Sequence, residues 1–207
     1  MQKTIFDTPL VQPLFQILSI TILKLLGWKR EGSIKGTERS VVIAAPHTSN
    51  WDFFYTLLIA FAFRKKMYWM GKDKLFKKPF GPVVRWMGGI PVDRSRASNL
   101  VEKTILCFKE QDELSIVIAP EGTRGRVNYW KTGFYRIATG AGVPILPAYL
   151  DYKEKRGGFG KLFFPTGDID RDMEKIRAFY SDKTGKNSNL FNHKSEIADY
   201  KKDRFVS

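Results

Sequence analysis

The apolar run from Val41 to Ala45 restricts the fold of this 207-residue chain more than any other stretch. Five consecutive apolar residues without an alternating polar position are typical of a strand buried on both faces, as in the middle of a parallel sheet. A second run, from Leu114 to Ala119, is interrupted only by Ser115. Segments with helical periodicity separate such runs, so the sequence predicts a single α/β domain with a mostly parallel mixed sheet flanked by helices. The 43% hydrophobic content suits one substantial core.

The expected elements fall into three regions of the chain. Strands are predicted at residues 40–45, 67–71, 114–119, 143–152 and 162–164, with a short strand or turn at 89–93. Helices are predicted at residues 49–63, 75–87, 99–113 and 135–139. We therefore expect an amphipathic, membrane-associated segment at 1–30, the α/β domain at 31–185 and a polar C-terminal tail at 186–207.

The segment from Leu10 to Trp28 is strongly apolar. As a helix of about 20 residues it would reach roughly 30 Å, which is enough to cross a bilayer. However, Gln12, Gln16 and Ser19 lie on one helical face, and apolar residues repeat along the other. This pattern predicts an interfacial helix that lies in the membrane surface. A membrane-spanning helix and a core helix without a membrane role are the alternatives.

Composition restricts the binding partners and the chemistry. The chain has 35 Lys and Arg against 21 Asp and Glu, a formal net charge of +14, which favours an anionic partner. Basic residues beside apolar segments favour an anionic membrane surface. The sequence lacks a recognisable nucleic-acid-binding module, so we expect no nucleic-acid partner. With one cysteine, Cys107, and two histidines, we expect no internal disulfide and no metal site.

A histidine and a carboxylate follow the first apolar run. His47 comes two residues after Ala45, and Asp52 follows five residues later. An imidazole titrates near neutrality, and a carboxylate can hold it in one tautomer, as a general base requires. Five residues on an ideal helix subtend about 500°, so the side chains meet only if loop changes to helix between them. Pro46 and Ser49 favour such a break. In the alternative interpretation, Asp52 only caps the helix and His47 is an ordinary loop residue.

A second polar cluster, Glu121-Gly122-Thr123-Arg124, follows the second apolar run. The carboxyl ends of parallel strands meet at one edge of a sheet, where α/β proteins usually place their sites. Gly122 permits close approach of the backbone to a ligand, and Thr123 and Arg124 can hydrogen-bond phosphate oxygens. The alternative is a polar turn with a Glu–Arg ion pair.

Two more segments complete the pattern. Residues 88–94 read Gly-Gly-Ile-Pro-Val-Asp-Arg, and Arg94 offers a second guanidinium for a phosphate. A solvated arginine after a turn is the alternative for that position. Residues 143–147 read Val-Pro-Ile-Leu-Pro and carry no ionisable group, so they are expected to form an apolar wall.

Together these four segments resemble the glycerolipid acyltransferase family, whose best-known members are the 1-acylglycerol-3-phosphate acyltransferases. The motifs H-x-x-x-x-D, G-x-I-P-V-D-R, E-G-T-R and V-P-I-x-P stand here in the order and spacing of that family. The resemblance covers roughly residues 40–150. One motif alone would be weak evidence, whereas four in order are specific.

The resemblance implies a glycerol-3-phosphate acyltransferase-like fold and an O-acyltransferase reaction. It implies that His47 takes the proton from an acceptor hydroxyl as general base, and that Asp52 orients His47. The acceptor would be bound, with the arginines on its phosphate, by Arg94, Glu121, Gly122, Thr123 and Arg124. The acyl donor would be the thioester of coenzyme A or of acyl carrier protein, a co-substrate, and the family needs no cofactor.

The resemblance also implies an acceptor and a location. The acceptor would be a lyso-glycerophospholipid, with 1-acylglycerol-3-phosphate converted to phosphatidic acid, and the protein would be peripheral or monotopic on the cytoplasmic face of a membrane. Residues 125–130 form a shorter stretch before Lys131 than the family usually has, which puts the acceptor in question. A different lyso-lipid acceptor, a transacylase reaction and a non-catalytic lipid-binding relative are the alternatives. The carrier of the acyl group and the oligomeric state are left open.

Overall fold

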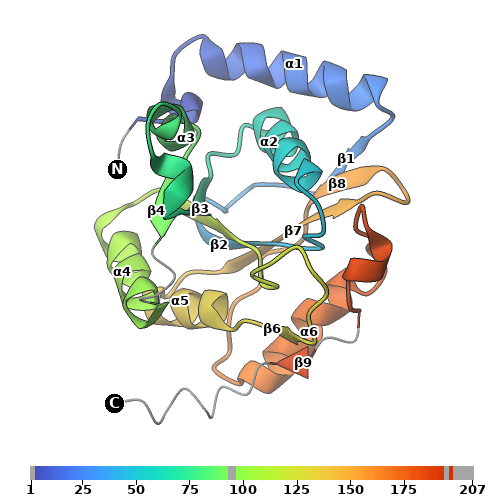
Figure 1. The fold of residues 1–207 in the computed structure, drawn as a ribbon. Coiled ribbons are helices and arrows are strands. Elements are labelled where there is room, and N and C mark those ends of the chain that lie inside the picture. Colours follow the sequence, from blue (N-terminus) through green and yellow to red (C-terminus); the bar gives the residue numbers. More distant parts are fainter. Residues whose placement is uncertain (1–2, 93–96, 194–195, 198–207) are drawn as a thin grey trace.

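Seven strands form one mixed sheet in the computed structural model, which describes residues 3–92, 97–193 and 196–197 (Figure 1). Their order is β1-β8-β7-β2-β5-β3-β4. Within this described sheet, β7 and β8 run antiparallel and every other neighbouring pair is parallel. The predicted α/β domain with a mostly parallel mixed sheet is therefore confirmed.

The elements alternate between strands and helices along the chain. The strands of the main sheet are β1 (Lys29–Glu31), β2 (Arg39–Ala44), β3 (Tyr68–Lys72), β4 (Gly89–Val92), β5 (Leu114–Ile118), β7 (Ile145–Asp151) and β8 (Arg156–Phe159). A second, two-stranded sheet pairs β6 (Tyr129–Trp130) with β9 (Glu196–Ile197). The helices are α1 (Val11–Leu25), α2 (Trp51–Phe63), α3 (Gly81–Trp86), α4 (Ala97–Glu110), α5 (Gly133–Ala141) and α6 (Ile169–Tyr180). Short 3₁₀ helices are η1 (Ile5–Asp7), η2 (Asp73–Phe76) and η4 (Ser188–Leu190).

Helices cover both faces of the main sheet, and this explains the continuous apolar run in β2. Figure 1 shows α1, α2 and α3 on one side and α4, α5 and α6 on the other. Val41 and Ile43 belong to the same core cluster as Phe108 of α4, whereas Val42 packs in a second cluster with Leu58 of α2. Successive residues of a strand point to opposite faces, so a strand with two covered faces needs apolar residues throughout.

The topology brings three loops to one edge of the sheet. β2 pairs in parallel with β5 on one side and with β7 on the other. The carboxyl ends of these three strands therefore lie side by side. The loop after β2, the loop after β5 and the turn after β7 meet at this edge, where α/β folds usually bind ligands.

Helix α1 packs on the protein through both polar and apolar side chains and exposes other apolar side chains on its outward side. The Gln16 amide donates to the main-chain carbonyl of Ala62 at the end of α2, at 3.4 Å. Ser19 and Leu23 are buried against the domain. The outward side exposes large apolar residues, namely Leu14, Ile17, Leu18 and Leu25. A helix is present where the amphipathic segment is predicted, but part of the predicted apolar face contacts the protein. Phe15 packs on Phe61 and Ile22 on the second core cluster, whereas the outward apolar residues are exposed.

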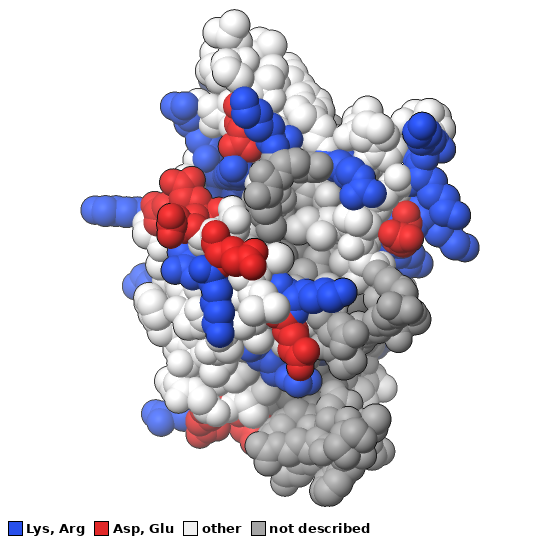
Figure 2. All heavy atoms as spheres, turned by 90° about the vertical axis from the view of Figure 1, so that its left-hand side faces the viewer, with Lys and Arg blue, Asp and Glu red and all other residues white. Residues whose placement is uncertain are grey.

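A second exposed apolar surface lies beside α1. It comprises Leu75 of η2 together with Phe80, Val83 and Trp86 at α3. The Trp86 indole N–H donates to the Thr8 hydroxyl at 3.2 Å, which joins α3 to the N-terminal segment. Figure 2, which faces α3 and α4, shows uncharged surface at the top, where α1 lies, and Lys and Arg side chains below it. No helix in the described part of the chain is long and apolar enough to cross a membrane.

The structure differs from the sequence-based prediction in several segments. The strand predicted at 162–164 is only an isolated bridge between Phe163 and Ile145, and β1, β6 and β8 form where no strand is predicted. The helix predicted at 75–87 is divided into η2 and α3, because Pro79 lacks an N–H and Pro82 is suited to a first helical turn. Helix α6 falls in a segment for which no helix is predicted. Its charged residues obscure an apolar stripe at helical spacing, formed by Met173, Ile176 and Tyr180, all of which are buried.

Candidate active site

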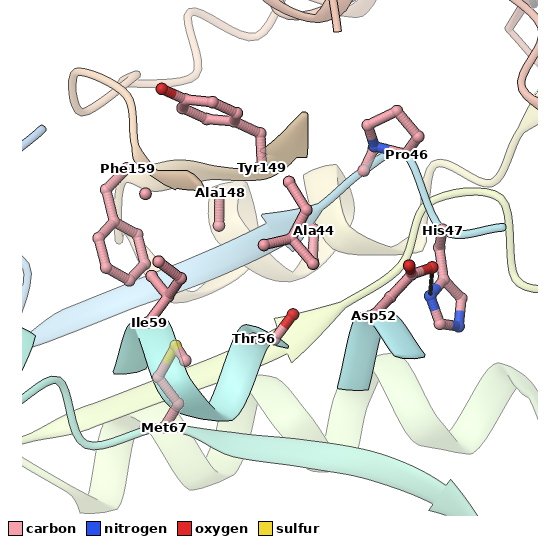
Figure 3. A pocket seen from close by; sticks show the side chains of 13 residues that line it. Ala44, Pro46, His47, Asp52, Thr56, Ile59, Met67, Ala148, Tyr149 and Phe159 are labelled. Atoms are coloured by element: carbon pink, nitrogen blue, oxygen red, sulfur yellow. Dashed lines mark ion pairs between the residues drawn. The ribbon is translucent and has the colours of Figure 1, made fainter. Parts of the chain in front are cut away.

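His47 and Asp52 meet at the carboxyl end of β2. The chain leaves β2 through Pro46, passes His47 in a loop, and enters α2 at Trp51, so the predicted change from loop to helix is present. His47 Nδ1 lies 3.2 Å from Asp52 Oδ2, and Figure 3 shows the two side chains facing one another beside a pocket. The Asp52 side chain is 4% exposed and that of His47 is 23% exposed. The imidazole is thus accessible, while its partner carboxylate is buried.

Asp52 is held by a dense set of donors. The main-chain N–H groups of Thr48 and Ser49 each donate to Oδ2 at 2.8 Å, and the Tyr152 hydroxyl donates to Oδ1 at 2.8 Å. Burial alone would raise the pKa of Asp52, but hydrogen bonds from His47, Ser49 and Tyr152 outweigh it and lower the pKa. Asp52 is therefore an anion at neutral pH. One carboxylate binds the backbone at the helix start and also faces His47, so the two interpretations of Asp52 are compatible.

Glu121 lies directly behind His47. Its Oε1 accepts the main-chain N–H of His47 at 2.9 Å, and the residue is only 5% exposed. Burial raises the pKa of the Glu121 carboxyl to about 7, since hydrogen bonding compensates it only in part. Within the described residues, Glu121 Oε2 is buried without a hydrogen-bond partner. The carboxyl of the second motif thus fixes the backbone of the first.

The remaining predicted site residues lie on the loop after β5 or outside the described ranges. Gly122 has a φ of +67°, and a Cβ there would lie 3.0 Å from the Lys131 side chain, so glycine suits the position. Thr123 and Arg124 are exposed on the turn. Arg94, the second predicted phosphate ligand, lies outside the described residues. The structure therefore brings His47, Asp52 and Glu121 together and leaves Arg124 facing solvent.

The main-chain amides around His47 are already engaged. The N–H groups of His47, Thr48 and Ser49 all donate to the carboxylates of Glu121 or Asp52. An N–H that donates to a carboxylate is not free to stabilise another developing negative charge.

A small cavity adjoins the His47–Asp52 pair (Figure 3). Its volume is about 30 Å³, which is room for one or two water molecules. Its wall away from the pair is mainly apolar and includes Ala44, Ile59, Met67, Ala148 and Phe159.

The segment after α6 joins the first and second motifs. The Asn187 side chain donates to the carbonyl of Thr48 at 2.7 Å, and its main-chain N–H donates to the Thr48 hydroxyl at 3.1 Å. Arg126, two residues after the second motif, donates to the carbonyl of Asn189 at 3.1 Å. The sequence analysis assigns residues from 186 onward to a polar tail. Their described part contacts the site, a role that polar composition alone does not indicate.

Sequence reasoning also misses Tyr152. Its hydroxyl reaches Asp52 from the turn after β7, 100 positions away in the chain. The strand predicted at 143–152 offers one indication of its position. If that strand is parallel to β2, its carboxyl end, where Tyr152 stands, lies at the same edge as His47. Without the strand order, however, nothing identifies this tyrosine among the eight in the chain.

Three comparisons show which known proteins this chain is similar to. The family model described as Acyltransferase matches residues 29–151. A 1-acyl-sn-glycerol-3-phosphate acyltransferase of Haemophilus influenzae is 32% identical over 133 residues, which are 59% of this chain and 54% of the relative. The Escherichia coli protein of the same name is 30% identical over 130 residues, 59% of this chain and 51% of the relative. The chain thus spans about half the length of the curated relatives it matches.

A solved structure shares the fold. The crystal structure of the 1-acyl-sn-glycerophosphate acyltransferase from Thermotoga maritima superposes with a TM-score of 0.60 at 19% identity. The match covers 82% of this chain and 76% of that one.

Proposed function

The chain belongs to the acyltransferase family, and from this premise we propose that it transfers a fatty acyl group from an acyl thioester to the hydroxyl of a lyso-glycerophospholipid. The proposed acceptor is 1-acylglycerol-3-phosphate, after the names of the relatives. The observation that carries the proposal is the contact between an accessible imidazole and a buried, ionised carboxylate at the carboxyl edge of the sheet.

His47 acts as the general base in this proposal. With Nδ1–H directed at Asp52, the Nε2 lone pair is available for the proton of the acceptor hydroxyl. The hydroxyl oxygen attacks the thioester carbonyl, and the tetrahedral intermediate collapses to an ester and a thiolate. The imidazolium returns its proton to the thiolate, so no acyl-enzyme forms. Asp52 stabilises the transient imidazolium, and placing the hydroxyl on Nε2 supplies much of the rate.

Arg124 and Thr123 would bind the acceptor phosphate, with Arg94 as the second guanidinium. Arg124 follows β5, which pairs with β2 and ends at the same edge as His47. Glu121 and Gly122 would shape this part of the site, since Glu121 holds the His47 backbone. The acyl group would arrive on coenzyme A or on acyl carrier protein.

The acceptor class can be tested with Arg124→Ala. We expect the KM for 1-acylglycerol-3-phosphate to rise about 10-fold to 100-fold, because a charge-assisted hydrogen bond to phosphate is lost. The KM for an uncharged monoacylglycerol should stay within about twofold, since a neutral headgroup makes no such ion pair. Initial rates with a labelled acyl thioester and both acceptors measure this difference.

The control for that experiment is Arg171→Ala, which removes the same charge from the exposed surface of α6. An equal change for both acceptors in Arg124→Ala would contradict the phosphate-binding role. If neutral or zwitterionic lyso-lipids were acylated and 1-acylglycerol-3-phosphate were not, the acceptor would be a different lyso-lipid from the one proposed. No turnover with any acceptor or phospholipid donor would favour a non-catalytic lipid-binding relative.

The proposed location is the cytoplasmic leaflet of a membrane, bound through α1 and the η2–α3 surface. Leu14, Ile17, Leu18 and Leu25 of α1 are exposed, so this outward apolar surface is available for the bilayer. Lysines beside η2, at positions 74, 77 and 78, are exposed next to Leu75 and Phe80. Each basic side chain near an anionic leaflet contributes about 1 kcal/mol.

The double variant Leu14→Ser, Ile17→Ser tests this surface. These side chains are 62% and 66% exposed, so their replacement should leave the melting temperature unchanged. We expect affinity for vesicles containing phosphatidylglycerol to fall at least about tenfold, because the apolar area that enters the bilayer is lost. Sedimentation with vesicles measures the affinity.

The matched control is Leu106→Ser, an exposed leucine of α4 on the other side of the sheet. Unchanged vesicle binding in the double variant would contradict the interfacial role of α1. Deleting the N-terminal segment is a poorer test, because Leu23 and Trp28 are buried in the core and their loss would destabilise the domain.

A further inference from the structure

We propose that Tyr152 is a positioning residue that holds Asp52 in the orientation required by His47. This inference rests on the proposed function. The Tyr152 hydroxyl donates to Asp52 Oδ1 at 2.8 Å, while His47 and the amides of Thr48 and Ser49 all use Oδ2. The two carboxylate oxygens thus have separate partners. A donor on Oδ1 prevents the carboxylate from rotating and keeps Oδ2 directed at Nδ1.

The Tyr152 ring is itself held on several sides. It packs edge-on against Trp28 at a centroid separation of 5.1 Å and against Tyr55 of α2 at 5.6 Å. The Lys186 ammonium lies 5.6 Å from the ring centroid, and the main-chain N–H of Tyr152 donates to the carbonyl of Thr184 at 2.9 Å. A donor fixed in this way by the fold is already oriented before substrate binds.

The phenol is suited to act as a permanent donor. Burial and the Asp52 carboxylate both raise the pKa of Tyr152 above its ordinary value, so the hydroxyl keeps its proton throughout the physiological range. A carboxylate can only accept, which sets the direction of this hydrogen bond.

Tyr152 lies just outside the segment that matches the family model. Tyr152 is the first residue after the matched range 29–151, Trp28 is the last residue before it, and Lys186 belongs to the segment beyond α6. The donor to Asp52 Oδ1 therefore comes from just outside the matched range, and Trp28 and Lys186 from either end of the chain contact its ring. The four motifs do not include this contact.

Tyr152→Phe tests the inference, because it removes the hydroxyl and keeps the ring that packs on Trp28 and Tyr55. We expect kcat to fall about tenfold, with the KM of both substrates within about twofold of the parent. We also expect the acid limb of the pH–rate profile to move to higher pH. Asp52 becomes more basic when it loses a donor, so it stabilises the protonated state of the pair more strongly.

The control is Tyr68→Phe, which removes another tyrosine hydroxyl from a buried residue, in β3, where Lys66 is its neighbour. That variant should keep parent kcat and the parent pH profile. A Tyr152→Phe enzyme with parent kcat, or with a loss of kcat but an unmoved acid limb, would overturn the inference.

A second measurement separates this inference from the acyltransferase proposal. ¹⁵N-histidine labelling in a His193→Gln background leaves only the ring signals of His47, because the chain has two histidines. We expect the Nδ1–H tautomer in the otherwise unchanged chain and a larger share of Nε2–H in Tyr152→Phe. The same tautomer ratio in both proteins would overturn the positioning role. If the parent chain transfers no acyl group, the proposed function fails while the tautomer measurement still decides whether Tyr152 positions Asp52.

Discussion

Replacing His47 with alanine is expected to reduce acyl transfer by about 10²-fold to 10⁴-fold and to leave the fold intact. The loss is large because His47 Nδ1 faces the ionised Asp52, which leaves Nε2 to take the hydroxyl proton in the proposed reaction. Folding should be preserved because the imidazole is partly exposed and the main-chain N–H that donates to Glu121 remains in alanine. Initial rates and thermal unfolding of the parent and the variant measure the two effects.

His193→Ala is the matched control for this prediction. His193 is exposed, and its ring packs against Phe191. Its replacement should leave kcat unchanged, which separates the loss of one particular imidazole from the loss of any histidine. Undiminished turnover in a folded His47→Ala protein would exclude His47 as the general base and would require another group to take the hydroxyl proton.

Asp52→Asn is expected to lose about 10³-fold or more in kcat, because an amide cannot stabilise the imidazolium as a carboxylate does. The amide oxygen can still accept from Thr48 and Ser49, and the phenol of Tyr152 can accept from the amide nitrogen. The local geometry should therefore survive while the charge is lost. KM values should change much less than kcat, since Asp52 is buried behind His47 and does not face the acceptor.

The same variant should lose stability in a pH-dependent way. The pKa of Asp52 is lowered in the folded state, so its carboxylate stabilises the protein above its ordinary pKa of 3.8. This contribution disappears as the pH falls through the still lower pKa of the folded state. We expect Asp52→Asn to reduce the free energy of unfolding by about 1–3 kcal/mol at pH 7, and by less near pH 3.5.

Urea unfolding at the two pH values measures this difference. Asp170→Asn, at an exposed position in the first turn of α6, is the control and should change stability little at either pH. Parent-like kcat in Asp52→Asn would argue against an orienting and charge-stabilising role. A stability loss that is equal at both pH values would indicate that packing rather than charge is responsible.

The candidate site could be predicted where the information is local. The apolar run of β2, the break at Pro46 and the polar start of α2 are all encoded within a dozen residues, so the His47–Asp52 pair could be proposed from sequence. The same holds for the loop after β5, because a strand followed by Glu121 and Gly122 is a short-range pattern. Helix α6 also had a local signal in its buried stripe, and its charged surroundings concealed it.

Contacts between distant segments could not be predicted in this way. Glu121 lies 74 positions from His47, Tyr152 lies 100 positions from Asp52, and Asn187 lies 139 positions from Thr48. Each contact depends on the order of β7, β2 and β5 in the sheet and on the path of the chain after α6. Strand order is decided by packing against the helices on both faces, which no short sequence pattern specifies.

The sequence by itself determined that this chain forms an α/β domain, that α1 is amphipathic, and that a histidine and an aspartate flank the start of a helix. The tertiary structure decided which face of α1 contacts the protein and which groups hold Asp52 in place. The physical reason is the separation in sequence between the residues that interact. Secondary structure and motif spacing arise from neighbours within a few turns, whereas the orientation of the buried Asp52 carboxylate also depends on Tyr152, a donor from a part of the chain far from residues 47–49.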